Sequence, residues 1–167
     1  MTNPSLPDAE ALLAALIAQM RAHVTAQTGL VGIVTGGAWL AERLHRELKL
    51  EVPHGSLDVS FYRDDFQHKG LKHKVTPSAI PFEVEGRDLI LVDDVLYTGR
   101  TIRAAMNELF DYGRPASIRL AALVDRGGRE LPIAAQFVGT VLALPAQHNI
   151  ELKRDAQGRL SLALQQP

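Results

Sequence analysis

The chain has 167 residues, 46% of them hydrophobic and 22% charged, which is the composition and length of one ordinary globular domain spanning residues 1–167. The formal net charge of −1 excludes a general attraction for nucleic acid or anionic membranes. The absence of cysteine excludes disulfides, thiol catalysis and cysteine-ligated metals. Since neither a signal peptide nor an apolar run near the roughly 18 residues of a membrane span is found, we expect a cytoplasmic protein without a membrane partner.

Helical and strand patterns alternate in the first third of the chain. Residues 9–27 carry apolar side chains at helical spacing, and Asp8 stands where a helix cap is expected. Residues 30–34 are short and β-branched, which predicts a strand. They are followed by a glycine turn at residues 35–37 and a second helical pattern over residues 38–50.

The middle of the chain predicts three strands, a long loop and a helix. Residues 57–62 alternate as a strand, and residues 63–86 show no sustained period. A connection of this length is typical of a functional lid. The continuous apolar run of residues 88–94 predicts a strand buried on both faces, followed by a helix over residues 101–113 and a buried strand over residues 117–125.

The last third predicts a strand over residues 137–144 and a hairpin over residues 149–164 that turns at Gln157 and Gly158. Strands that alternate with helices indicate an α/β protein whose mostly parallel sheet carries helices on both faces. Such sheets bind ligands at the carboxyl ends of their strands.

The segment LILVDDVLYTGRT is the most informative part of the sequence. Asp93 and Asp94 follow a buried strand, where two adjacent carboxylates repel each other and are costly to desolvate, so we infer that they serve a ligand. The loop after them enters a helix N-terminus. The segment therefore predicts a binding site for one phosphate. Its ligands would be backbone N–H groups of the helix N-terminus and the hydroxyls of Thr98 and Thr101, and Gly99 permits close approach. Carboxylates beside a phosphate fit a sugar phosphate or a nearby Mg²⁺.

This segment resembles the 5-phosphoribosyl-1-pyrophosphate motif of the type I phosphoribosyltransferases. The surrounding sequence resembles one family within this group, the PyrR family. The residues that carry this resemblance are DVSFYRDD and PFEVEGRDLILVDDVLYTGRTIRAAMNELFDYGRPASIRLAALVDRGGRELPI. PyrR proteins are pyrimidine operon attenuators that are also uracil phosphoribosyltransferases. The resemblance runs from about Leu30 to Phe137 and implies the type I phosphoribosyltransferase fold: a mostly parallel twisted sheet flanked by helices, with a small hood and a flexible lid loop over about residues 63–86.

The resemblance also implies the residues of the catalytic centre. Asp93 and Asp94 would bind the ribose hydroxyls, and Arg63, directly after a predicted strand, would be the lid cation that acts beside them. The loop that would hold the 5-phosphate comprises Val95, Leu96, Tyr97, Thr98, Gly99, Arg100 and Thr101.

Two further segments complete the implied site. The pyrophosphate loop would consist of Thr35, Gly36 and Gly37. PyrR proteins commonly carry Thr-Arg-Gly there, so Gly36 removes a side-chain charge from the pyrophosphate while keeping the backbone amides. On the base side, Asp125 ends a strand and Arg126 would reach uracil, or would equally form a structural ion pair with Asp125 or Glu130.

The implied reaction transfers the ribose phosphate of 5-phosphoribosyl-1-pyrophosphate to uracil, which yields UMP and pyrophosphate. Mg²⁺ would be held mainly by the oxygens of the substrate, because it keeps several of its waters and would contact Asp93 and Asp94 through them. No histidines have ligand spacing for a separate metal site. A homo-oligomer, dimer or larger, is expected. Two alternatives stay open: a UMP-dependent RNA-binding attenuator, and a nucleotide sensor with little catalysis. RNA binding has little support, since Leu12 and Leu13 stand where the RNA-attenuating relatives are expected to carry arginines.

Overall fold

The computed structural model describes residues 5–60 and 77–165. Its centre is a five-stranded sheet in the order β2-β1-β3-β4-β5, in which every neighbouring pair is parallel. The strands are β1 (Gly29–Ile33), β2 (Gly55–Leu57), β3 (Asp88–Leu96), β4 (Ser117–Asp125) and β5 (Phe137–Val141). The predicted parallel α/β architecture is therefore confirmed.

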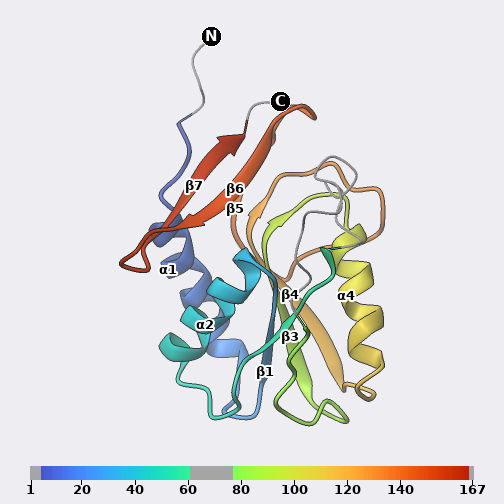
Figure 1. Ribbon diagram of the computed structural model, residues 1–167. Coiled ribbons are helices and arrows are strands. Elements are labelled where there is room, and N and C mark those ends of the chain that lie inside the picture. Colours follow the sequence, from blue (N-terminus) through green and yellow to red (C-terminus); the bar gives the residue numbers. More distant parts are fainter. Residues whose placement is uncertain (1–4, 61–76, 166–167) are drawn as a thin grey trace.

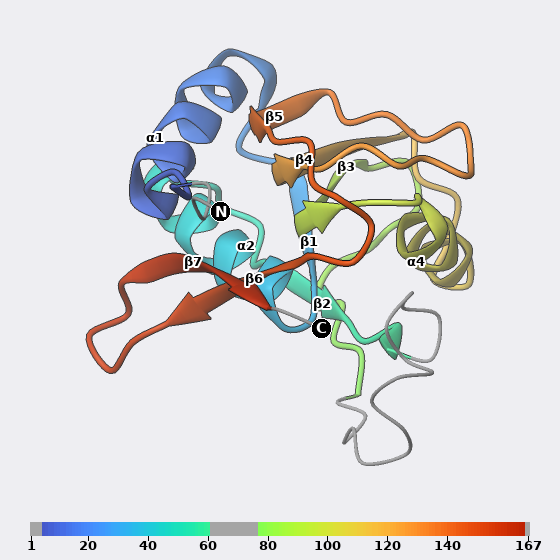
Figure 2. The same ribbon diagram turned by 90° about the horizontal axis from the view of Figure 1, so that it is seen from above.

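Helices cover both faces of this sheet (Figures 1 and 2). Helices α1 (Ala9–Met20) and α2 (Gly36–Leu48) lie on one face, and α4 (Arg100–Phe110) lies on the other. Asp8 caps α1 by accepting the N–H of Glu10 at 3.0 Å, as its position in the sequence predicts. In the described part of the chain, no helix has the length and hydropathy to cross a membrane.

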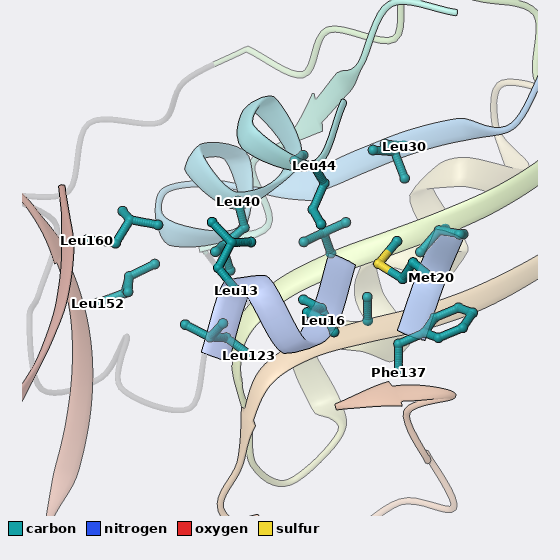
Figure 3. Close-up of a cluster of buried hydrophobic side chains, with 14 of the residues drawn as sticks. Leu13, Leu16, Met20, Leu30, Leu40, Leu44, Leu123, Phe137, Leu152 and Leu160 are labelled. Carbon is teal, nitrogen blue, oxygen red and sulfur yellow. The ribbon is translucent and has the colours of Figure 1, made fainter. Parts of the chain in front are cut away.

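Strand β3 separates two hydrophobic cores because successive residues of a strand point to opposite faces. Ile90 and Val92 belong to the core under α1 and α2, whereas Leu89 and Leu91 belong to the core under α4. Figure 3 shows the first of these cores, in which α1 side chains such as Leu16 pack against α2 and the sheet.

A separate two-stranded antiparallel sheet forms the small hood that the fold class predicts. Its strands are β6 (Asn149–Arg154) and β7 (Leu160–Gln165), and the turn between them contains Gly158 at φ +82°. The predicted hairpin is therefore confirmed. Ile150, Leu152 and Leu160 are buried in the same core as α1 and α2, which fixes the hairpin to the body (Figure 3).

Several segments differ from the sequence prediction. The helical pattern of residues 9–27 forms an α-helix only as far as Met20, and a 3-10 helix follows over Arg21–His23. The strand predicted over residues 57–62 lies earlier, at β2, because the Asp58 carboxylate accepts the N–H of Ser60 at 3.0 Å and turns the chain away from the sheet. Of the predicted lid, only residues 77–86 are described. They pack on the body, where Ala79 pairs with Ser56 and Val84 is buried.

The edge of the sheet at β5 is covered by a side chain. The Gln19 amide of α1 donates to the Val138 carbonyl at 2.8 Å and accepts the Val138 N–H at 3.2 Å. One side-chain amide thus replaces the backbone partner that a further strand would supply.

The Glu10 carboxylate joins three elements and provides a test of hood attachment. It forms a bidentate pair with Arg43 of α2, at 2.8 and 3.1 Å, and accepts the N–H of Leu160 in β7 at 2.8 Å. The hydrogen bond from Arg43 is the main cause that lowers the pKa of Glu10 below its ordinary value of 4.5.

The Glu10→Gln variant is expected to lower the free energy of unfolding at neutral pH by about 1–2 kcal/mol, because the charge on the acceptor is lost. A group with a lowered folded-state pKa contributes stability above its unfolded pKa and loses it as the pH falls through the folded value. The difference between wild type and variant should therefore shrink below the ordinary pKa of 4.5, which urea denaturation at several pH values measures. An equal difference at all pH values would contradict this account. Glu42→Gln, which breaks a more exposed pair with Arg154 at 3.6 Å, is the control.

Candidate functional site

The carboxyl ends of β1 and β3 lie side by side, because the two strands are parallel neighbours. Strand β2 lies on one side of β1, whereas β3, β4 and β5 lie on the other side. The strand order therefore reverses between β1 and β3, which makes this the topological switch point of the sheet. Parallel sheets bind ligands at this kind of position. The predicted segments 35–37 and 93–101 both follow these two strand ends.

The Thr-Gly-Gly segment forms the start of α2. Thr35 is the N-cap, and Gly36 and Gly37 are the first two helical residues rather than the plain turn that the sequence predicts. A Cβ on Gly37 would lie 2.3 Å from the carbonyl oxygen of Val92, and one on Gly32 would lie 2.4 Å from the carbonyl oxygen of Gly37. These glycines therefore let the N-terminus of α2, with its unpaired N–H groups, rest directly on the sheet.

Each of the two carboxylates of β3 accepts a backbone N–H, which offsets part of the cost of placing adjacent acids at the strand end. Asp93 is 3% exposed, and its Oδ1 accepts the N–H of Asp94 at 2.9 Å. Asp94 is half-buried, and its Oδ1 accepts the N–H of Val95 at 2.9 Å. Its Oδ2 lies only 2.4 Å from where a Cβ on Gly36 would stand. A side chain at position 36 would therefore have to displace the Asp94 carboxylate, which lies beside the N-terminus of α2.

The predicted phosphate loop is shorter than its sequence suggests. Val95 and Leu96 remain in β3, where each pairs with a residue of β4. Helix α4 begins at Arg100, so Thr101 lies in its first turn and does not start it. The loop proper is therefore Tyr97–Gly99, followed at once by a helix N-terminus that favours an anion.

This short loop is fixed from behind by the segment that follows β4. Thr98 is 5% exposed, its Oγ1 accepts the N–H of Arg100 at 3.2 Å, and its carbonyl accepts two N–H groups of residues 130–131 at 2.9 and 3.1 Å. Gly99 has φ +93°, and a Cβ there would lie 2.9 Å from Ile133. These contacts hold the loop from the side of the segment that follows β4.

On the predicted base side, Arg126 is buried and connects the loop to the hood. Its guanidinium donates to Asn149 Oδ1 and to the Pro145 carbonyl at 3.2 Å each, and it lies 4.0 Å from the centre of the Tyr97 ring. The other contact of that ring is Gly128, since a Cβ there would lie 2.5 Å from it. Tyr97 is therefore held between an arginine and a glycine backbone.

The sequence left open an ion pair of Arg126 with Asp125 or Glu130, and the structure assigns both acids to other arginines. Asp125 Oδ2 accepts from Arg129 at 2.5 Å, and Glu130 pairs with Arg100 at 2.8 Å in a more exposed contact. Arg126 donates to neutral oxygens instead.

Arg129 is the residue of this region that the sequence did not single out. Besides Asp125, it donates to the Tyr97 carbonyl at 2.7 Å and to the Ile133 carbonyl at 2.8 Å. Two of its three acceptors are backbone carbonyls in irregular segments, for which a sequence carries no periodic signal.

Arg63, the remaining predicted site residue, lies outside the described residues. Within the described ranges, no three carboxylate or histidine side chains converge as metal ligands. His45 and His54 form a ring pair with centroids 5.4 Å apart, and burial is the main cause that lowers the pKa of His54, with a smaller effect of His45.

The sequence matches the family model described as "Phosphoribosyl transferase domain" over residues 5–150. It is 54% identical to the bifunctional protein PyrR of Pseudomonas aeruginosa over 153 residues, and this alignment covers 89% of each chain. It is 50% identical to the bifunctional protein PyrR of Ralstonia nicotianae over 162 residues, and this alignment covers 95% of this chain and 92% of the relative.

Solved structures with the same fold include the HGPRT-ase of Leishmania tarentolae in complex with GMP, with a TM-score of 0.64 and 19% identity over 90% of this chain and 85% of the other. A hypoxanthine phosphoribosyltransferase from Staphylococcus aureus also gives a TM-score of 0.64, with 20% identity over 85% of this chain and 77% of the other. Fold, family model and close relatives agree, and the chain belongs to the PyrR family of the type I phosphoribosyltransferases.

Proposed function

We propose that the protein is a uracil phosphoribosyltransferase that makes UMP and pyrophosphate from uracil and 5-phosphoribosyl-1-pyrophosphate. The observation that carries the proposal is the placement of two helix N-termini, those of α2 and α4, at adjacent strand ends on either side of Asp93 and Asp94. The substrate carries a phosphate group and a pyrophosphate group, which are separated by a ribose. Two anion sites separated by carboxylates match that order of charges.

In the proposed reaction the bond from ribose C1 to pyrophosphate breaks and a bond from C1 to a uracil nitrogen forms, while that nitrogen loses its proton. Positive charge develops on the ribose and negative charge on the departing pyrophosphate. The amides of Gly36 and Gly37 at the start of α2 would stabilise the departing charge. Tyr97–Thr101 would hold the 5-phosphate, and the fixed loop would orient C1 towards the base side near Arg126.

Mg²⁺ fits this arrangement as a partner of the substrate. Asp93 and Asp94 offer hard oxygen ligands at the strand end, but one oxygen of each already accepts a backbone N–H. The ion would therefore take most ligands from pyrophosphate, ribose and water. When bound, it would neutralise charge on the leaving group.

The deciding experiment incubates the purified protein with 5-phosphoribosyl-1-pyrophosphate, Mg²⁺ and each of uracil, hypoxanthine, guanine and orotate. The proposal requires formation of UMP to exceed formation of the other nucleotides. Preference for a purine or for orotate would overturn the assigned base, and absence of turnover with every base would favour the nucleotide sensor.

The double variant Thr98→Val, Thr101→Val tests the phosphate cradle. It is expected to weaken UMP binding about tenfold or more, because UMP carries the 5-phosphate that the hydroxyls would contact. Isothermal titration calorimetry with UMP measures the change, and the matched control is Ser117→Ala, which removes a hydroxyl at the opposite end of the sheet. Unchanged UMP affinity in the double variant would place the 5-phosphate elsewhere.

RNA binding is the second proposed activity, since relatives named bifunctional share about half of the sequence. The first helix gives it little support. Leu13 is 1% exposed in the core, Leu12 packs against that core, and α1 has no basic residue in its last turn. Both leucines thus contribute to packing rather than to a cationic face.

We therefore expect weak binding to a pyrimidine leader RNA, with a shallow dependence on salt. Each phosphate contact adds about 0.7–0.9 to the slope of log affinity against log salt, so few contacts give a small slope. A salt titration with and without UMP measures it. Nanomolar, UMP-dependent binding with a steep slope would instead make regulation the main function.

A further inference from the structure

A second cavity lies on the outer side of α2, between that helix, the start of α1 and the β6–β7 hairpin. Its volume is about 590 Å³, within the range of small-molecule sites. None of its lining residues belongs to the segments 35–37, 93–101 or 125–126 of the strand-end site. In Figures 1 and 2 the hairpin runs past α1 and α2 on the side away from α4. Gln157 and Gly158 of its turn line the cavity.

The cavity concentrates positive charge in a chain whose net charge is −1. Four arginines and two glutamates line it, an excess of two positive charges. The pair with Glu10 neutralises Arg43, and Glu42 lies 3.6 Å from Arg154. Within residues 5–60 and 77–165, the side chains of the two others, Arg46 and Arg159, form neither a hydrogen bond nor an ion pair.

The cavity also offers a flat aromatic wall. The indole of Trp39 lines it, and the guanidinium of Arg154 lies 4.7 Å from the centre of that ring. Three other lining residues are joined to one another, since Glu10 accepts hydrogen bonds from the Arg43 guanidinium and from the N–H of Leu160. Planar guanidinium and indole groups stack on flat rings, and arginine forks match phosphate oxygens.

We propose that this cavity binds a nucleoside phosphate, with its base stacked in the region of Trp39 and Arg154 and its phosphates held by Arg46 and Arg159. The site is separate from the strand-end site and does not depend on the proposed reaction. It would let a nucleotide bind next to the helix whose first turn forms the pyrophosphate loop.

Trp39 is the only tryptophan of the chain, so its fluorescence reports on this cavity directly. UTP is the probe, titrated into the full chain with the tryptophan excited selectively. We expect saturable quenching that weakens roughly tenfold or more in the double variant Arg46→Gln, Arg159→Gln. The matched control Arg103→Gln, Arg114→Gln removes two exposed arginines from elsewhere on the surface and should leave the quenching unchanged.

Two further titrations distinguish the alternatives. The Thr98→Val, Thr101→Val variant should keep the quenching, and pyrophosphate and uridine alone should bind more weakly than UTP. Equal affinity for UTP in the two arginine double variants would overturn the proposal, because the signal would then come from elsewhere. Pyrophosphate that binds as tightly as UTP would also overturn it, since the base would not be recognised.

Discussion

Asp94→Asn is expected to keep the fold and to lower kcat/KM for UMP formation about 10- to 100-fold, the equivalent of roughly 1.5–3 kcal/mol for a hydrogen bond to a charged group. The asparagine oxygen still accepts the N–H of Val95, so the local structure persists, but the charge at the proposed ribose site is lost. Steady-state kinetics with varied 5-phosphoribosyl-1-pyrophosphate measures the loss.

The same strand supplies the control. Asp88, at the other end of β3, accepts the hydroxyl of Ser117 at 2.6 Å and is exposed. Asp88→Asn removes one carboxylate charge from β3 far from the strand-end site and should leave kcat/KM unchanged. Full activity of Asp94→Asn would show that the acids of β3 do not act on the substrate.

Arg129→Met is expected to lower the free energy of unfolding by about 2–3 kcal/mol, because it breaks a partly buried ion pair and two hydrogen bonds at once. The variant leaves Asp125, 17% exposed, without its closest cation and frees the carbonyls of Tyr97 and Ile133. UMP affinity should fall as well, since the phosphate loop loses its fixed position. Urea denaturation and calorimetry measure the two effects.

The neighbouring pair provides the comparison for this result. Glu130→Gln weakens the pair with Arg100, whose side chains are 54% and 53% exposed, and exposed pairs contribute about 0–1 kcal/mol. If Arg129→Met lowered the free energy of unfolding no more than Glu130→Gln does, the role of Arg129 in fixing the loop would be refuted.

The sequence predicted the parts of the fold that depend on local patterns. The continuous apolar run of β3, the amphipathic α1 and the hairpin turn at Gly158 each have a local pattern that the structure confirms. The strand at residues 57–62 was predicted wrongly because its alternation continued past the point where Asp58 turns the chain.

The site was harder to predict where residues act through contacts distant in the sequence. Gly36 and Gly37 look like a turn because glycine is a poor helix former, yet they begin α2, where Gly37 rests on the backbone of β3 with no room for a side chain. Arg126 was expected to reach uracil or to pair with a neighbouring acid, whereas its side chain is buried and donates to Asn149 and Pro145 of a segment about twenty residues away. Spacing in a sequence does not reveal such contacts.

The contact between Gly36 and Asp94 makes the two positions interdependent in evolution and in engineering. Any side chain at position 36 would meet the Asp94 carboxylate, since even a methyl group would lie 2.4 Å from Oδ2. Introducing the arginine common in PyrR proteins would therefore add a charge and also displace a neighbouring acid. The effect of a change at position 36 cannot be added to that of a change at position 94, so the two belong in one double-mutant cycle.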